Sequence, residues 1–576
     1  MVTTNNISRF TPVALLLALL GTGQAAPALS QEARPDPSVE LRREQEEEAR
    51  RRALAAPGNA AAPKDLRSRE NDRLPADETP CFRIREVRLR GNDAGHFDWA
   101  LDALDGPDGQ DSPMGRCLGV QAIALLQKRL QNGIIARGYV TSRVVVGNQN
   151  LADGVLVFEP VGGRLDRLVD GSNAGRQVRL DTAFPGQTGE LLNLRDLEQG
   201  LENLQRVPTV TADMQIAPGQ TPGRSDIAVS WQQDRAWRMA LSLDDAGNDT
   251  TGRYQAGATL SADNPLGLSD LAYLSLTRGF GGKDGPSPKG TQALAVHYSV
   301  PVGYWLYRFN ASHNTYHQTV EGAYDRYRYS GRSDNLEFGV DRVLLRDNRQ
   351  ILSAQTSLQH RRSNNHIDDT EVLVQRRAVT SLQLGLAHRL YLGRGVLQSE
   401  LNYRQGLSGL GTKAAPEEPF GEGTSRYRLS TAALTLQMPW AFDQHTLRYV
   451  GSLRLQKHHT RLTPQDRFSI GGRYSVRGFD NAASLVAESG AVWRNELALS
   501  FKDMPSLMPY VGLDLGQVSG PSTENLPGKR LTGAVLGLRG QIAGLQYELF
   551  YGRPVNKPPE LRASPSTWGF MLYQSY

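Results

Sequence analysis

The segment TLRYVGSLRLQ (446–456) decides the fold class, because its side chains alternate between two faces. From Leu447 onward every second residue is leucine, tyrosine or glycine, whereas the other face carries Arg448, Arg454 and Gln456. A period of two places successive side chains on opposite sides of a β-strand. One apolar and one polar face over about ten residues is the pattern of a strand that crosses an outer membrane.

The same alternation recurs from about residue 238 to Tyr576, and helical periodicity disappears there. Short connections such as PVG (301–303) alternate with long ones such as 315–334, 361–378 and 406–429. An outer-membrane barrel has short periplasmic turns and long outer loops, and closure removes the unpaired edges that lipid does not tolerate. We therefore predict a transmembrane β-barrel of sixteen antiparallel strands over 238–576. The predicted strands begin near residues 239, 255, 270, 293, 304, 335, 350, 379, 396, 430, 446, 491, 507, 530, 544 and 568.

The overall composition excludes several classes of protein. At 576 residues the chain is too long for one simple core. A hydrophobic content of 39% and a mean hydropathy of −0.44 argue against a helical membrane protein. The net charge of +5, without a concentrated basic face, gives no support for nucleic-acid binding. Zinc spacings, phosphate loops and nucleophile elbows are missing from the sequence, so we expect no metal site, no cofactor and no enzyme.

The first residues predict an export signal. Arg9 precedes the apolar run PVALLLALL (12–20), which is followed by small residues. This order is typical of a signal peptide, which we place at 1–28 with cleavage after Ala25 or Ala28. The apolar run is much shorter than the roughly 18–20 residues that span a membrane as a helix. The chain is therefore predicted to leave the cytoplasm.

Cys81 and Cys117 are the two cysteines of the sequence. In an exported protein, an isolated pair forms a disulfide more often than a metal site. The loop between them would contribute about 3–4 kcal/mol by the chain-entropy estimate. We predict a structural disulfide.

A charged segment and a tether follow the signal. The segment SVELRREQEEEARRRAL (38–54) pairs opposite charges four residues apart, such as Arg43 with Glu47, and has no apolar stripe. By itself this pattern favours a solvated spacer helix, and the alternative is a helix that sits in a water-filled space. Residues 55–80 are rich in alanine and proline, which is typical of a flexible linker.

Two small domains are predicted at 81–161 and 162–233. Each has the order strand, helix, strand, strand, with amphipathic helices in 120–139 and 192–207. Such units build small sheets with helices on one face. The free edges of these sheets can accept an extended strand from a partner.

The connection at 457–490 is the longest predicted outer loop and contains RYSVRGFDN. A sixteen-stranded barrel encloses an aqueous lumen, so this loop can fold inward and place Arg477 there. Asp514 is a candidate acceptor, because Leu513 and Leu515 on either side would face lipid and Asp514 would face the lumen. A charge-assisted pair between Arg477 and Asp514 would hold the loop in the channel. The alternative is that Arg477 caps an exposed turn and Asp514 is one of many lumen charges.

Four motifs carry a family resemblance. FSIGGRYSVRGF (468–479) and YVGLD (510–514) resemble the two signature stretches of the outer-membrane assembly and translocation superfamily. GRCLGVQAIALLQKRLQNGIIARGYVTSRV (115–144) and VWRNELALSF (492–501) are similar to the first polypeptide-transport-associated (POTRA) domain and to the twelfth strand of one branch. That branch is the transporter partner of two-partner secretion systems, which secrete haemolysins, haemagglutinins and contact-dependent inhibition proteins. The resemblance covers the whole mature chain.

The resemblance implies an outer-membrane barrel of sixteen strands, preceded by two POTRA domains and by a plug helix at 38–54. It thereby reverses the preference for a solvated spacer at that segment. It also implies a conserved loop motif and an inner-wall aspartate as its partner. In this sequence those positions are Val476, Arg477, Gly478, Phe479 and Asp514. One departure is Tyr576, which stands where the family usually ends in phenylalanine.

The implied function is a monomeric outer-membrane pore that recognises a large partner exoprotein and moves it from the periplasm to the cell surface without nucleotide hydrolysis. The exoprotein would be an adhesin, a haemolysin or a contact-dependent toxin. Its N-terminal secretion domain would bind the POTRA domains in the periplasm, and outer-membrane lipid would surround the barrel. The main alternative is a barrel-assembly insertase for outer-membrane proteins, which typically has more POTRA units and no such plug. A passive porin would have no reason for two periplasmic domains.

Overall fold

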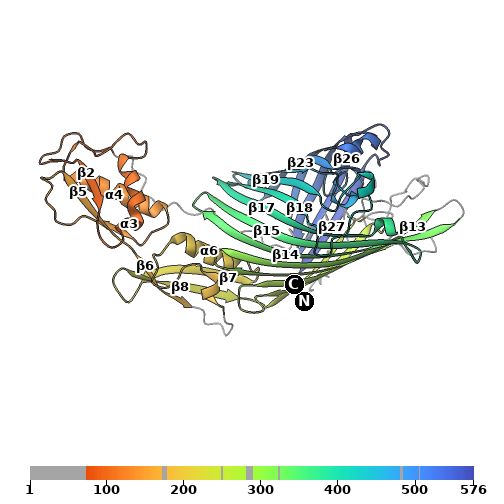
Figure 1. Cartoon of the computed structure of the whole chain (residues 1–576), viewed down its shortest axis with the longest axis horizontal. Coiled ribbons are helices and arrows are strands. Elements are labelled where there is room, and N and C mark those ends of the chain that lie inside the picture. Colours follow the sequence, from red (N-terminus) through yellow and green to blue (C-terminus); the bar gives the residue numbers. More distant parts are fainter. Residues whose placement is uncertain are drawn as a thin grey trace, which may run out of the picture.

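A computed structural model describes residues 73–170, 178–247, 251–280, 290–321, 325–480, 484–504 and 506–576. Two small domains precede a large barrel along the chain (Figure 1). The predicted signal peptide (1–28), the predicted plug helix (38–54) and most of the predicted linker (55–80) lie outside the described residues. No helix in the described part of the chain is both long and apolar enough to cross a membrane.

The first domain packs helix α4 against a three-stranded sheet of order β2-β5-β4, in which β2 runs parallel to β5. Leu126, Leu130 and Ile134 of α4 are fully buried in the core, as their helical spacing predicts. Cys81 and Cys117 form a disulfide beside the short β1–β3 pair. The elements are β1 (Phe82–Arg83), β2 (Glu86–Leu89), α3 (Ala94–Phe97), the 3₁₀ helix η2 (Asp98–Asp105), β3 (Cys117–Leu118), α4 (Val120–Ala136), β4 (Arg143–Val145) and β5 (Val155–Val161).

Residues 73–80 belong to the first domain, so the predicted linker is wrong over this part of its length. Leu74 is buried in the domain core, and its backbone N–H donates to Asp111 at 2.8 Å. The Glu78 carboxylate accepts hydrogen bonds at 2.8 to 3.0 Å from three backbone N–H groups around the start of α4. A carboxylate stabilises a helix N-terminus in this way. Composition does not reveal such a contact, because it depends on where the helix begins in space.

The second domain repeats the arrangement with a sheet of order β6-β8-β7, in which β6 is parallel and β7 antiparallel to β8. Helix α6 begins after Asn193, whose side chain accepts a hydrogen bond from the backbone N–H of Arg195. Leu197 and Leu204 of α6 are buried against the sheet. The elements are β6 (Arg164–Asp170), α5 (Leu180–Ala183), α6 (Leu194–Gln205), β7 (Val210–Pro218) and β8 (Arg224–Gln233).

The second domain docks on the periplasmic turns of the barrel through polar contacts of α6. The Tyr304 hydroxyl donates to Asp196 at 2.5 Å, and Arg346 forms an ion pair with Glu202. Burial raises the pKa of Asp196 above its ordinary value. A polar pocket of about 350 Å³ lies between this helix and the barrel wall. The domain is therefore fixed at the periplasmic mouth.

Sixteen antiparallel strands of the described chain close the barrel, because β27 pairs with β9. Fifteen of the sixteen predicted starts lie within three residues of the observed ones. The strands are β9 (Trp237–Asp244), β10 (Tyr254–Asp263), β11 (Leu271–Phe280), β12 (Gly290–Val302), β13 (Trp305–Glu321), β14 (Arg326–Arg346), β15 (Gln350–Ile367), β17 (Arg377–Leu392), β18 (Gly395–Gly406), β19 (Arg428–Phe442), β20 (His445–His458), β23 (Ser489–Phe501), β24 (Met508–Ser519), β25 (Arg530–Ile542), β26 (Leu545–Asn556) and β27 (Thr567–Ser575). A two-residue strand, β16 (Thr370–Glu371), extends the end of β15.

The predicted start of the sixth strand near residue 335 is wrong, because β14 begins at Arg326. The predicted long loops 315–334 and 361–378 are in large part strand as well. The 21 residues of β14 span about 70 Å, whereas the apolar band of such a barrel is only about 25 Å tall. Above that band both faces of a strand meet water, so the alternation that marks a membrane strand is lost.

Candidate functional site

The loop between β20 and β23 folds into the barrel and packs on its inner wall. Its two short strands, β21 (Phe468–Ile470) and β22 (Leu485–Ala487), pair with each other. Val476 and Phe479 of the predicted motif are buried in a small apolar core. That core joins loop and wall side chains: Phe468, Ile470, Val476, Phe479, Leu485 and Ala487 from the loop, and Val492, Val518 and Leu531 from the wall. The inward position predicted for the loop is therefore held by hydrophobic contact as well as by charge.

Arg477 and Asp514 form a bidentate ion pair. The Arg477 Nε and Nη2 atoms donate to the two carboxylate oxygens of Asp514 at 2.8 and 2.9 Å. The backbone N–H of Arg477 donates to the same carboxylate at 3.0 Å. Asp514 is completely buried, whereas Leu513 and Leu515 are 46% and 38% exposed on the lipid-facing side. The two groups singled out in the sequence thus meet inside the barrel, and the alternation along β24 assigns Asp514 the correct face.

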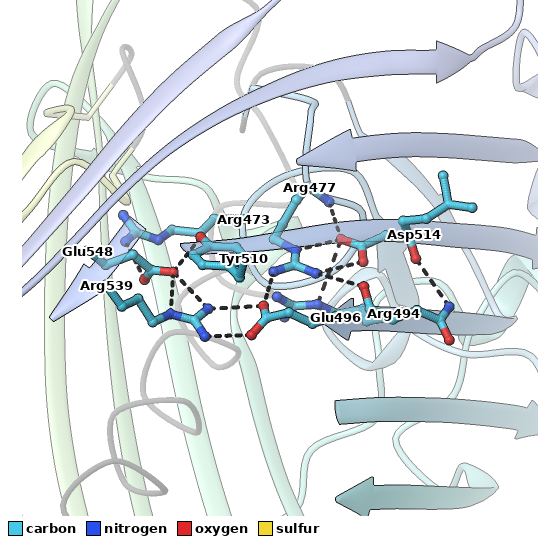
Figure 2. A network of polar contacts seen from close by, with 10 residues as sticks. Arg473, Arg477, Arg494, Glu496, Tyr510, Asp514, Arg539 and Glu548 are labelled. Atoms are coloured by element: carbon cyan, nitrogen blue, oxygen red, sulfur yellow. Dashed lines mark hydrogen bonds and ion pairs between the residues drawn. The ribbon is translucent and has the colours of Figure 1, made fainter. Parts of the chain in front are cut away.

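Further charges extend this pair along the wall, as Figure 2 shows. Arg477 Nη1 donates to Glu496 at 2.6 Å, and Arg539 donates to the other oxygen of Glu496 at 2.5 Å. Arg539 also donates to Glu548 at 2.9 Å. Negative and positive side chains therefore alternate along the chain of contacts, in the order Asp514, Arg477, Glu496, Arg539 and Glu548. This sequence of contacts joins the loop to strands β23, β24, β25 and β26.

Arg473 connects the same loop to the seam where the barrel closes. Its guanidinium lies 3.6 Å from Glu548 and donates to Asp245 at 3.1 Å. It also donates to the backbone carbonyl of Phe570 in β27 at 3.0 Å. Asp245 directly follows β9, the strand that pairs with β27. The loop therefore contacts β27 and the residue that directly follows β9.

The network pairs buried charges of opposite sign, and Arg253 adds a further cation 3.5 Å from Asp245 at its edge. Buried ions cost free energy unless they are paired, and truncating one member of a buried pair is strongly destabilising. The described residues of the network are Arg473, Arg477, Arg494 and Arg539 with Asp245, Glu496, Asp514 and Glu548. Each arginine lies within 4 Å of at least one carboxylate oxygen of the set, so any single truncation leaves its neighbours with fewer counter-charges.

Two glycines allow the close approach of loop and wall. Gly478 has a φ of +100°, a conformation that other residues rarely adopt. A Cβ atom at Gly533 of β25 would lie 1.8 Å from the backbone carbonyl oxygen of Arg477. A backbone oxygen has little freedom to move, so only glycine fits at position 533.

Gly533→Ala is expected to displace the loop from the barrel wall, because the added methyl group destabilises the packing of the loop on β25 by about 1–3 kcal/mol. The loop of the purified variant should become cleavable by protease within 459–488, while the barrel stays folded. Ala534→Leu is the matched control, because residue 534 lies on the opposite face of the same strand. Equal protection of the loop in Gly533→Ala and in the unmodified chain would contradict the packing.

The sequence does not single out the other members of the network, which are Asp245, Arg473, Arg494, Glu496, Arg539 and Glu548. Alternation alone assigns the inward face to Glu496, because Trp493 and Leu497 are exposed to lipid. The signal for Arg539 with Glu548 is the cross-strand register, since these two residues are direct partners in the β25–β26 ladder.

Comparison with protein families gives three matches along the chain. A family described as haemolysin secretion/activation protein ShlB/FhaC/HecB matches residues 223–540. A ShlB-type POTRA domain family matches residues 82–159, and a second POTRA family matches residues 166–218. The POTRA matches cover the two small domains, and the first match covers most of the barrel.

Known proteins and structures agree with these matches. The chain is 32% identical to outer membrane transporter CdiB-2 of Burkholderia pseudomallei strain 1026b, over 97% of this chain and 98% of that protein. It is 26% identical to hemolysin transporter protein ShlB of Serratia marcescens, over 70% and 71% of the two chains. Among solved structures, CdiB from Acinetobacter baumannii superposes with a TM-score of 0.83 at 28% identity, covering 94% of this chain and all of that one.

Proposed function

The chain belongs to the haemolysin secretion/activation protein family ShlB/FhaC/HecB and is an outer-membrane transporter of two-partner secretion, and from this premise we propose how it handles its cargo. The cargo is a large exoprotein, either an adhesin, a haemolysin or a contact-dependent toxin. Its N-terminal secretion domain binds the periplasmic POTRA domains and then enters the barrel. The transporter acts as a monomer, catalyses no reaction and hydrolyses no nucleotide.

The docking of the second POTRA domain at the periplasmic mouth carries this proposal. Helix α6 of that domain lines the polar pocket of about 350 Å³ together with the barrel wall, so a segment bound there lies at the entrance to the lumen. Strand β7 is an edge of the domain's sheet and can pair with an extended segment, whereas the first residues of the other edge strand, β6, already bond to residues 189–191. The polar lining suits an unfolded chain, whose backbone groups need hydrogen-bond partners.

The loop motif and the N-terminal segment are proposed to control the pore. The contact between Arg477 and Asp514 holds the loop against the wall, and this contact is kept or changed as the exoprotein passes. The predicted plug helix (38–54) occupies the lumen at rest and leaves it for transport. Its charge on all sides suits a water-filled channel.

A deletion strain tests this function directly. We expect deletion of the gene to remove one very large protein from the culture supernatant and to leave other outer-membrane barrels at their normal levels. Both are measured by comparing supernatant and outer-membrane fractions with and without the chain. Depletion of many barrel proteins from the membrane would instead identify a barrel-assembly insertase, and the plug assignment would fail with it.

A further inference from the structure

The outward faces of β14 and β15 change from apolar to charged towards the outer surface. Leu336 and Phe338 of β14 are 48% and 51% exposed, which marks their side of the strand as the lipid-facing one. Arg332 lies on the same side, because side chains alternate. On β15, Arg362 shares a face with the exposed Leu358 in the same way. The charged side chains therefore stand just beyond the apolar band, on the outside of the barrel.

The loop after β18 folds over this face and completes a pocket. The backbone N–H of Lys413 donates to the Ala378 carbonyl of β17 at 2.8 Å. A Cβ atom at Gly411 would lie 3.2 Å from the ring of His360, which shares the outward face with Arg362. The pocket has a volume of about 480 Å³. Its lining residues are Arg332, Asp334, Arg362, Ser363, Asn364, Glu371, Arg376, Arg377, Ala378, Gly411 and Lys413.

This pocket carries an excess of positive charge, with five basic and two acidic lining residues. The two acids are engaged, since Asp334 pairs with Arg332 at 2.9 Å and Glu371 pairs with Arg376. Arg362 donates to His360 Nε2 at 2.9 Å. Within the described ranges, no ion pair engages Arg362 or Lys413. Arg377 pairs with Glu417, so two exposed cations, Arg362 and Lys413, remain for an anionic ligand.

Exposed apolar side chains stand beside these cations. Leu410, the neighbour of Gly411, is 67% exposed. Leu373 and Val374, in the segment between Glu371 and Arg376, are 65% and 68% exposed. Apolar side chains next to a basic pocket at the edge of a lipid-facing band match an amphipathic ligand with an anionic head and acyl chains.

We propose that this pocket binds the phosphate groups of lipopolysaccharide in the outer leaflet, with Arg362 and Lys413 as the main contacts. The inference rests on the outer-membrane location of the chain, not on its cargo. Guanidinium groups match phosphate oxygens with two parallel hydrogen bonds, and lysine adds a compact charge. Arg361, the neighbour of Arg362 on β15, points inward to Asp466 of the lumen loop. Bound lipid therefore stabilises the strand that anchors this loop from the opposite side.

The test uses the purified full-length protein in detergent and labelled lipopolysaccharide as the probe. The variant Arg362→Ala with Lys413→Ala is expected to bind the probe at least tenfold more weakly, because both charge-assisted contacts are lost. The matched control is Arg428→Ala with Arg530→Ala, which removes two exposed basic side chains from the outer ends of β19 and β25. It should bind within about twofold of the unmodified chain. Arg362→Lys with Lys413→Arg should restore most of the binding, which separates charge from folding.

Two further probes identify the source of the anion. Lipopolysaccharide stripped of its phosphates should bind the unmodified protein about as weakly as intact lipopolysaccharide binds the alanine variant. Inorganic phosphate alone should compete only at far higher concentration, because it lacks the acyl chains. The proposal is overturned if the alanine variant binds normally, if the control loses as much affinity, or if phosphate-free lipid binds as well as the intact form.

Discussion

Arg477→Ala is expected to reduce secretion of the partner exoprotein at least tenfold while the barrel still inserts in the outer membrane. The change removes both hydrogen bonds of the bidentate pair with Asp514 and one hydrogen bond to Glu496. Breaking a buried ion pair costs about 3–5 kcal/mol, and each 1.4 kcal/mol corresponds to a factor of about ten in an equilibrium. The loop would then leave its position on the wall in a large share of molecules. Immunoblots of supernatant and periplasm measure the loss of export.

Arg308→Ala is the matched control for this experiment. Arg308 lies on the inward face of β13, opposite the exposed Tyr307 and Phe309, and its ion pair with Asp341 spans 2.8 Å. No hydrogen bond or ion pair joins this pair to the part of the lumen loop that the structure describes. Both variants should still fold into barrels. On a gel, each should therefore migrate differently before heating than after heating has unfolded it, as the unmodified chain does. Arg308→Ala controls for barrel folding alone, because its partner Asp341 lines the proposed entry pocket, and normal secretion by Arg477→Ala would refute a specific role for the loop motif.

Sequence alone predicts the fold well wherever the membrane imposes a pattern. Leu513, Asp514 and Leu515 illustrate why, because lipid on one side and water on the other force each residue to a defined face. The same constraint placed the strand starts accurately across the barrel. This constraint ends at the edge of the membrane. The sequence pattern therefore wrongly predicts a loop for the outer part of β14.

The network around Arg477 was only partly predictable, for a different reason. Arg539 and Glu548 are cross-strand partners, so the register of one hairpin is enough to pair them. Glu496 and Arg539 lie on β23 and β25, which are separated by β24, and their contact at 2.5 Å depends on the curvature of the wall. Alternation along a strand assigns a face but not a distance between strands. The contact of Arg473 with Asp245 additionally requires the path of the loop to the seam.

Asp466→Ala is expected to destabilise the first part of the lumen loop by about 3–5 kcal/mol, the cost of truncating a buried ion pair. Asp466 lies in the short 3₁₀ helix η5 (Pro464–Asp466), and its carboxylate accepts from Arg361 Nη2 on β15 at 2.7 Å and from Thr463 Oγ1 at 2.8 Å. Both charged side chains are at least nine-tenths buried. Protease cleavage within 459–467 of the purified protein should accelerate as the segment opens. Asp480→Ala is the matched control, because Asp480 is an acid of the same loop on the more exposed side.

Asp466 and Arg477 hold the loop to different strands of the wall, β15 and β24, and Arg473 binds it to the seam. Independent anchors act additively, whereas two residues of one rigid unit do not. We therefore expect Asp466→Ala to impair secretion less than Arg477→Ala, because the tip of the loop stays in place. The double variant should open the loop to protease more than either single variant does. If Asp466→Ala alone exposed the entire loop to protease, the contact at β15 would be the dominant anchor, and the pair of Arg477 and Asp514 would not suffice to hold the loop.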